Sequence, residues 1–356
     1  MQSAIEPCQR GMSSPISSSD VVAIGIGSAG IRIVSALSRE TTLVDRFAYI
    51  TCDPADLESA GGGERLLIEP PVAQKASPSM VRGFALPHLD RMKRLVRDAK
   101  VVFVVAGLGR ATGSGLAPIM AAFARSEGAD AVSIAVMPFD FEEKLRFYAG
   151  LALKKLRQVS EGVVVVDNGS LFNIGSEATL KELYQVANNE AVKALGSLLA
   201  RQSEDSVPVG LNKVLGTVSQ NGYSFLTCAS SGSTDKAEDA LSRAIIGIGK
   251  KARMNDASHA VVVLTGDRTL SASQTATAVK RLGSMFGSPS LDVEYAVSYR
   301  GTGSQLQVSV LASGFNETKY DSYDPIDGIL GARNNIDDDL DCSLLDGLDR
   351  LGPCDQ

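Results

Sequence analysis

The stretch GLGRATGSG, Gly107 to Gly115, lies between two apolar runs, KVVFVVA before it and LAPIMAAFA after it. Four of its nine residues are glycine, and Thr112 and Ser114 add two hydroxyl groups. A glycine loop between a buried strand and a helix serves either a tight packing turn or a phosphate group. A plain turn does not need hydroxyl donors, so this composition favours the phosphate.

The first half of the chain alternates apolar runs with helical patterns. The almost wholly apolar runs are suited to strands that are buried on both faces of a parallel sheet; they are 21–26, 47–51, 100–106, 130–137 and 162–167. The helical patterns between them cover 29–39, 78–98, 116–127 and 142–159. This alternation predicts a Rossmann-like α/β domain over 21–178 with a parallel sheet.

The rest of the chain predicts one long helix and a smaller α/β domain. The helix covers 179–202, where leucine and valine recur at helical spacing. A second domain over 207–315 alternates helices and strands. It ends with DVEYAVSY and QLQVSVLA, which the turn-like RGTGS separates, so these two strands are predicted to form a hairpin.

Composition and charge exclude several classes of protein. The apolar share is 44 %, the charged share is 21 %, and no apolar run approaches the roughly 20 residues of a membrane span. Residues 1–20 lack the layout of a signal peptide and are predicted to be a disordered lead-in. Five scattered cysteines and two histidines offer no metal-ligand spacing, so no metal-binding residues are predicted. We expect the reducing cytosol as the compartment.

The charge of the chain is concentrated at its C-terminal end. Residues 316–356 carry eleven acidic and three basic side chains and thus a net charge of −8. Because the whole chain has a net charge of −6, residues 1–315 carry about +2. We interpret 316–356 as an acidic flexible tail. A near-neutral body with an acidic tail does not favour nucleic-acid binding.

A second glycine loop, GIGSAG, follows the first strand at Gly25 to Gly30. Its spacing fits a dinucleotide fingerprint, with Asp53 about twenty residues further on. In a parallel sheet both glycine loops emerge at the carboxyl ends of the strands. Two such loops at one point are better explained by a nucleoside triphosphate. A pair of packing turns is the plain alternative, and a nicotinamide-dependent enzyme is a weaker one that leaves GLGRATGSG and PFDFEEKLR unexplained.

Several stretches, in order, resemble the tubulin/FtsZ superfamily. The residues from Gly109 to Gly115 are similar to its glycine signature, with Arg110 and Ala111 in place of two glycines. GIGSAG resembles its first glycine loop, PFDFEEKLR (138–146) its ribose loop, DNGSLF (167–172) its base loop, and QNGYSF (220–225) the start of its second domain. The resemblance covers about 21–315. It implies an FtsZ-like fold with a nucleotide-binding domain, a central helix and a second α/β domain.

The resemblance also implies which residues bind GTP or GDP, with Mg²⁺ as a candidate companion ion. Glu142 and Arg146 would contact the sugar and phosphates, Asn168 would bond the base, and Tyr184 would stack on guanine. Asn188 follows Tyr184 on one helix face, although both could also be ordinary half-exposed helix residues. The remaining expected contacts come from the two glycine loops; they are Gly25, Gly27, Ser28, Ala29, Gly30, Arg32, Gly107, Gly109, Arg110, Ala111, Thr112, Gly113, Ser114 and Gly115.

The sequence departs from the family where hydrolysis would be activated. In FtsZ an acidic loop after the central helix enters the next subunit's nucleotide site, but the corresponding positions here are Pro208, Gly210 and Lys213. In place of the family's phosphate-sensing glycine loop the sequence has PPVAQKASPSM, in which the side chain of Lys75 could contact the phosphate instead of backbone N–H groups. We therefore expect no catalytic residues in this loop and weak or absent self-activated hydrolysis.

These observations lead to two hypotheses of function. The first is a cytoplasmic GTP-binding filament protein that assembles head to tail and acts in cell division or cell shape. The second is a non-hydrolysing interaction protein that co-assembles with, or regulates, another FtsZ. Leucines at helical spacing in 343–353 could bind an adaptor protein, and no direct membrane insertion is expected.

Overall fold

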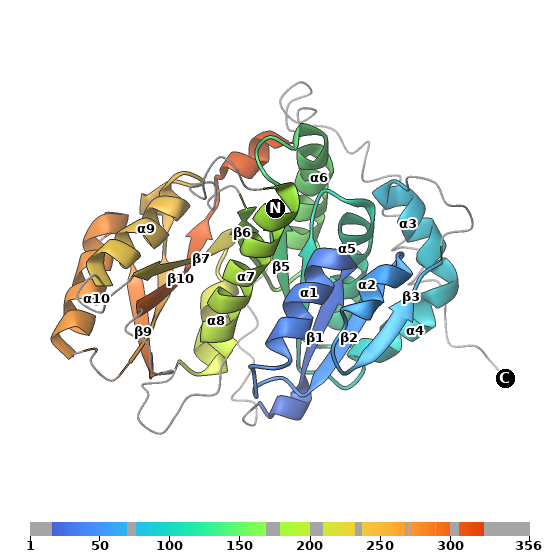
Figure 1. Cartoon of the computed structure of the whole chain (residues 1–356), viewed down its shortest axis with the longest axis horizontal. Coiled ribbons are helices and arrows are strands. Elements are labelled where there is room, and N and C mark those ends of the chain that lie inside the picture. The colour runs from blue at the N-terminus through green and yellow to red at the C-terminus, as the bar shows by residue number, and fades with distance from the viewer. Residues whose placement is uncertain are drawn as a thin grey trace, which may run out of the picture.

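The computed structural model of the chain describes residues 16–69, 76–168, 179–199, 209–231, 237–267, 270, 272–288, 290–299 and 306–323. Ten strands form one sheet in the order β3-β2-β1-β4-β5-β6-β7-β10-β8-β9 (Figure 1). The strands are β1 Val21–Ile26, β2 Arg46–Thr51, β3 Glu64–Leu67, β4 Val101–Gly107, β5 Asp130–Met137, β6 Gly162–Asp167, β7 Tyr223–Ser231, β8 His259–Gly266, β9 Asp292–Tyr299 and β10 Leu306–Phe315.

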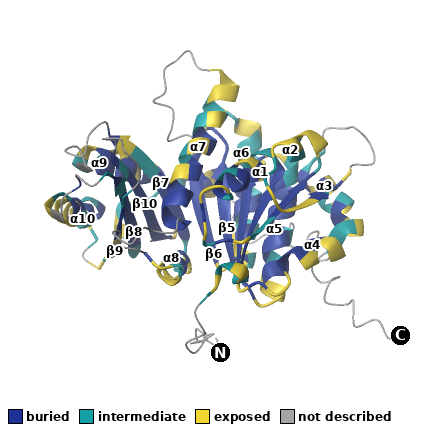
Figure 2. Cartoon of the chain, turned by 60° about the horizontal axis from the view of Figure 1, so that its bottom comes forward, coloured by how far each residue is buried: buried dark blue, intermediate teal, exposed yellow. Residues whose placement is uncertain are grey.

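Helices cover both faces of this sheet. They are α1 Gly27–Leu37, α2 Pro54–Glu58, α3 Pro78–Ala85, α4 Leu89–Val96, α5 Ala111–Ser126, α6 Glu143–Val159, α7 Leu180–Leu199, α8 Leu211–Val218, α9 Ala237–Gly249 and α10 Ala272–Phe286. One core packs against α3, α4, α5, α6, α9 and α10, and the other against α1, α7 and α8. The central strands are therefore buried on both faces (Figure 2), as their apolar runs predict.

The two halves of the sheet meet at a narrow seam. All pairs from β3 to β7 are parallel, but β6 and β7 share a register of only Val164 with Ser224 and Val165 with Phe225. The long helix α7 packs against α1 on one side of the seam and β7 on the other. The chain thus has a larger half with a parallel sheet, a long central helix and a smaller α/β half.

The structure corrects the predicted hairpin. β9 pairs with β8 in parallel, whereas β10 is antiparallel and lies between β7 and β8. The physical reason is burial: β10 is almost wholly buried and takes a central position, while β9 is half exposed along its first four residues and forms the sheet edge. β9 and β10 therefore both pair with β8 and do not form the predicted hairpin with each other.

Two predicted boundaries also shift. Ser18–Asp20 form a 3₁₀ helix, η1, inside the segment that was expected to be disordered, and Asp20 pairs with Lys100 at 3.0 Å. Lys319–Tyr323 form another, η6, in which Tyr320 and Tyr323 are buried, so the first residues of the expected tail are packed on the fold. Two aromatic side chains in five residues supply the apolar surface that holds η6 in place.

Candidate functional site

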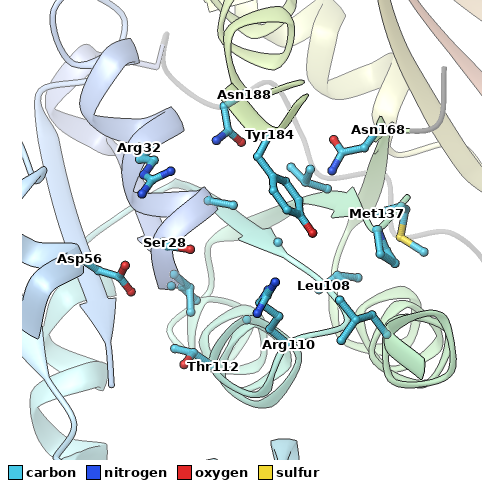
Figure 3. Close-up of a pocket in the computed structure, with 18 of the residues that line it drawn as sticks. Ser28, Arg32, Asp56, Leu108, Arg110, Thr112, Met137, Asn168, Tyr184 and Asn188 are labelled. Atoms are coloured by element: carbon cyan, nitrogen blue, oxygen red, sulfur yellow. The ribbon is translucent and has the colours of Figure 1, made fainter. Parts of the chain in front are cut away.

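A cavity of about 540 Å³ lies at the carboxyl ends of β1, β4, β5 and β6, beside the first turns of α1, α5 and α7 (Figure 3). This is the edge of a parallel sheet where ligands of open α/β folds bind. Of the residues expected from the sequence, the following line it: Gly27, Ser28, Ala29, Arg32, Gly107, Arg110, Thr112, Gly113, Asn168, Tyr184 and Asn188.

One end of the cavity is formed by the starts of two helices. α1 begins at Gly27, whose φ of 66° suits glycine, and a Cβ at this position would lie 3.5 Å from Cβ of Thr112 in the first turn of α5. The residues before the two helices, Ile26 and Arg110, make no side-chain hydrogen bond to the first N–H groups. These N–H groups and both helix dipoles therefore favour an anion at this end.

Several residues of the glycine loops shape the turns rather than line the cavity. A Cβ on Gly30 would lie 2.2 Å from the carbonyl oxygen of Val105, so only glycine lets α1 pack this close to β4. Ser114 is buried, and its Oγ accepts a hydrogen bond of 2.8 Å from the N–H of Gly109. Four other residues of the two glycine loops that were expected to bind the nucleotide do not line the cavity either: Gly25, Gly109, Ala111 and Gly115. The packing-turn interpretation therefore accounts for part of each loop.

The other end of the cavity carries polar side chains. Asn168, at the end of β6, is 4 % exposed, and its Oδ1 has no hydrogen-bond partner in the described part of the chain. Asn188 on α7 is also buried and lines the same cavity. A buried amide oxygen without a partner costs free energy, which a ligand that donates a hydrogen bond would recover.

Tyr184 is held between these two ends by neighbouring residues. Its hydroxyl donates a 2.5 Å hydrogen bond to Oε1 of Glu142, and its ring lies 5.2 Å from the ring of Phe139. Burial, followed by the bond to Glu142, raises the pKa of Tyr184 to about 12, so the phenol stays protonated at neutral pH. Oε2 of Glu142 accepts from the N–H of Phe139 at 3.0 Å, which fixes the carboxylate.

Glu142 and Arg146, which were expected to contact the sugar and phosphates, are not among the residues that line the cavity. Glu142 acts through Tyr184, as described above. Arg146 donates a 3.2 Å hydrogen bond to the carbonyl oxygen of Asp140, and its guanidinium lies 4.5 Å from the centre of the Tyr323 ring. Packing of η6 on α6 thus draws Arg146 away from the cavity.

Four charged residues connect this end of the cavity to the second half of the chain; we call Asp140, Asp167, Lys251 and Lys319 the charge cluster. Nζ of Lys319 lies 3.1 Å from Oδ1 of Asp140 and 3.0 Å from Oδ2 of Asp167, and Nζ of Lys251 lies 3.6 Å from the same Oδ2. The side chains of Lys251 and Asp167 are each 2 % exposed, and burial lowers the pKa of Lys251 to about 8. Because Asp167 precedes Asn168, the cluster fixes the strand end that carries the unpaired amide.

Comparison with known proteins identifies the family. Residues 20–176 match the family model described as Tubulin/FtsZ family, GTPase domain. The chain belongs to the tubulin/FtsZ family.

The relatives of this tubulin/FtsZ protein are distant. The cell division protein FtsZ of Mycoplasmopsis pulmonis is 26 % identical over 252 residues, 68 % of this chain and 63 % of the relative. FtsZ 1 of Methanocaldococcus jannaschii is 26 % identical over 231 residues, 63 % of this chain and 64 % of the relative. The chain therefore spans less than two thirds of the length of these curated relatives.

Solved structures support the fold. An FtsZ mutant from M. jannaschii superposes with a TM-score of 0.74 at 23 % identity, covering 83 % of this chain and 91 % of the other. CetZ2 from Haloferax volcanii, solved as a GTPγS-bound protofilament, gives a TM-score of 0.70 at 22 % identity and covers 86 % and 96 % of the two chains. These likenesses agree with the ten-stranded sheet and the central helix of this family member.

The cavity of this GTPase-family chain also has a wall that sequence reasoning missed. Apolar residues at the ends of β1, β4 and β5 and along two helices complete it: Ile26, Leu108, Val136, Met137, Pro138, Leu145 and Leu180. Val136 and Met137 could have been found, because they end a buried strand at the same sheet edge as both glycine loops. Leu145 and Leu180 carry no signal that separates them from ordinary helix residues.

Charged residues of both signs also line the cavity. Arg32, Arg110 and Lys181 line the cavity together with Asp53 and Asp56. Asp53 caps α2 by accepting from the N–H of Ala55, and burial raises the pKa of Asp56. In the described ranges no cluster of three or more metal-ligating side chains occurs. Among those same residues, no helix has both the length and the apolar character needed to cross a membrane.

Proposed function

We propose that this protein binds GTP or GDP in the cavity, with the guanine at Asn168 and the phosphates at the starts of α1 and α5. The unpaired, buried Oδ1 of Asn168 is the observation that carries the proposal. Guanine presents adjacent N–H donors at N1 and N2 to such an oxygen, whereas adenine has an acceptor at N1, no amino group at C2 and its one amino donor at N6. Membership of the tubulin/FtsZ GTPase family supports the same assignment.

The phosphate end is suited to a triphosphate. Two uncapped helix starts supply backbone N–H groups, and Arg32 on α1 and Arg110 before α5 supply positive charge. Mg²⁺ is commonly held by one or two carboxylates together with substrate phosphates. We therefore propose Asp53 and Asp56 as the carboxylates nearest to a nucleotide-borne Mg²⁺, without a dedicated metal cage.

We further propose that the protein forms head-to-tail filaments in a cytoplasmic cytoskeleton for cell division or cell shape, with slow or absent self-activated hydrolysis. No acidic residue occurs between Val207 and Ser219, the stretch in which FtsZ proteins carry catalytic acids. Pro208 lies outside the described residues; Gly210 precedes α8 without a capping side chain, and Nζ of Lys213 lies 2.5 Å from Oε1 of Glu294. A missing general base costs about 10²–10⁴ in rate.

The test is to identify the nucleotide that copurifies with the full chain and then to follow phosphate release over a range of protein concentrations. We expect guanine nucleotide and a release rate per subunit that stays low and flat. Turnover that climbs steeply with concentration would contradict slow hydrolysis. In that case Glu294→Gln would be the first variant to measure, because Glu294 is the carboxylate paired with Lys213.

The second candidate function is a non-hydrolysing protein that co-assembles with another FtsZ. The same acid-free stretch favours it, because a partner subunit would then supply the acids. Sedimentation of this protein alone, and mixed with an FtsZ from its own source, separates the two functions. Filaments of the protein alone support the first, and pelleting that depends on the partner supports the second.

A further inference from the structure

The outer face of α4 presents an unusual concentration of arginine. Met92, Leu95 and Val96 are buried against the core, while Arg91 and Arg94, three residues apart, are exposed on one side of the helix. Arg97 follows directly as the C-cap residue and is exposed too. Figure 2 shows the exposed surface of α4 at the margin of the fold. We call Arg91, Arg94 and Arg97 the arginine face.

The arginine face has no acidic partner in the described part of the chain. None of its three guanidinium groups lies within 4.0 Å of a described carboxylate, whereas the neighbouring Lys93 is paired with Glu127 at 3.4 Å. Asp90 and Asp98 flank the face but leave it with a net positive charge. Unpaired arginines held by a rigid helix are well suited to bidentate recognition of carboxylates.

The chain itself carries a segment of the opposite charge. Residues 324–356, outside the described part, contain nine aspartates and two arginines, a net charge of −7. Four of these aspartates lie within five residues, Asp337 to Asp341, and no other stretch of the chain is as acidic. Charge complementarity therefore points to this segment as the occupant of the arginine face.

The start of this segment is close enough to reach the arginine face. Tyr323, the last residue described, belongs to η6, which packs on α6; α6 packs on α5, and α5 packs on α4 (Figure 1). Neighbouring helices lie about 8–10 Å apart, so α4 is on the order of 20 Å from α6. An extended chain covers about 3.3–3.6 Å per residue, so the segment 324–336 that precedes Asp337 extends to about 45 Å, which spans that separation and the length of a helix as well.

We propose that residues 324–356 dock through Asp337–Asp341 on the arginine face of their own chain. Attachment at Tyr323 gives the segment a local concentration on the order of mM, which favours its own α4 over that of another molecule. The contact is exposed and charge-based, so it is weak and sensitive to salt. While docked, the acidic segment and the arginine face would each be blocked from binding another partner, until such a partner displaces the contact. The proposal is independent of nucleotide binding.

Zero-length carbodiimide crosslinking of the full-length protein, read by mass spectrometry, tests this docking. We expect Lys93 to be joined to the 337–341 aspartates, with a yield about fivefold lower in Arg94→Glu and nearly lost in Arg91→Glu/Arg94→Glu. Salt at about 1 M, where the Debye length is about 3 Å, should also abolish the crosslink. Arg39→Glu, which reverses an exposed charge in the turn after α1, is the matched control and should change nothing.

Internal controls keep every outcome interpretable. The Lys93–Glu127 and Lys100–Asp20 crosslinks report that α4 and its surroundings are folded in each variant. A mixture of isotope-labelled and unlabelled protein separates crosslinks within one chain from those between chains. The docking is refuted if Lys93 joins Glu127 but not the acidic segment, or if the segment joins Lys280 on α10 as often as Lys93. Persistence in the double variant, or links only between different chains, would also overturn it.

Discussion

The two ends of the cavity are built in different ways. The phosphate end consists of backbone: Gly27 and Thr112 bring together two helix starts, each within a few residues of the strand before it. The base end consists of side chains, with Asn168 and Tyr184 held by residues far away in the sequence, among them Lys251 and Lys319. The phosphate end therefore depends on local packing, whereas the base end depends on contacts between the two halves of the chain.

The largest expected effect concerns the charge cluster. Asp167→Asn leaves Lys251 buried with its main counter-ion removed, and breaking a buried pair in this way costs about 3–5 kcal/mol. Urea unfolding of the full chain measures this loss. Glu161→Gln, at the exposed start of the same strand region, is the control and should stay within about 0.5 kcal/mol of wild type. Equal stabilities of the two variants would show that the cluster does not hold the base end.

The next effect concerns the packing of the phosphate end. Gly30→Ala places a Cβ 2.2 Å from the backbone oxygen of Val105, and overpacking of this kind costs about 1–3 kcal/mol. Gly83→Ala on α3 meets no atom within 4 Å and should stabilise the protein by about 0.5–1 kcal/mol. Thermal unfolding of the two variants gives opposite signs if the close approach of α1 and β4 is as described.

The pH dependence of stability tests the burial of charged and titratable groups at the base end. The pKa of Lys251 falls from 10.5 to about 8 on folding, so between these values the unfolded chain binds more protons and stability rises with pH. Above pH 10 the raised pKa of Tyr184 acts in the opposite direction. Relative to Lys251→Met, the wild type should therefore gain about 2 kcal/mol between pH 8 and pH 10. Denaturant titrations at these pH values that show a constant difference would contradict the buried, charge-paired lysine.

The smallest effect concerns two adjacent asparagines of α7. Asn188 is buried in the cavity wall, whereas its neighbour Asn189 is exposed. Asn188→Ala should weaken GTP binding about fivefold through the loss of one hydrogen bond, on the order of 1 kcal/mol. Asn189→Ala should leave the affinity unchanged. Isothermal titration with GTP measures both, and equal affinities would place Asn188 outside the nucleotide site.

The sequence predicts the phosphate end well because its information is local. Apolar runs locate β1, β4, β5 and β6, and their parallel arrangement brings both glycine loops to one edge. Short or exposed strands carry less signal: β3, four residues with two exposed, was missed, and the crossing of β10 between β7 and β8 defeated the hairpin prediction. Strand order depends on which strand gains most from burial, and the turn residues do not encode it.

The base end was only partly predictable, because its contacts join distant segments. Asn168, Tyr184 and Asn188 were expected from the family resemblance and do line the cavity. Lys251, by contrast, is one of two lysines at the end of a helix, a position that ordinarily means solvent exposure, yet its side chain is only 2 % exposed. The packing of η6, which turns Arg146 toward Tyr323, likewise depends on a tertiary contact that no local pattern indicates.

The most direct test of the central claim is the ratio of GTP to ATP affinity in the wild type and in Asn168→Ala. If the unpaired Oδ1 of Asn168 reads guanine, the wild type prefers GTP, and the variant loses about tenfold or more of that preference while it still binds the triphosphate. A wild type that binds ATP as tightly as GTP, or a preference that survives Asn168→Ala intact, would contradict the placement of the base at this end of the cavity.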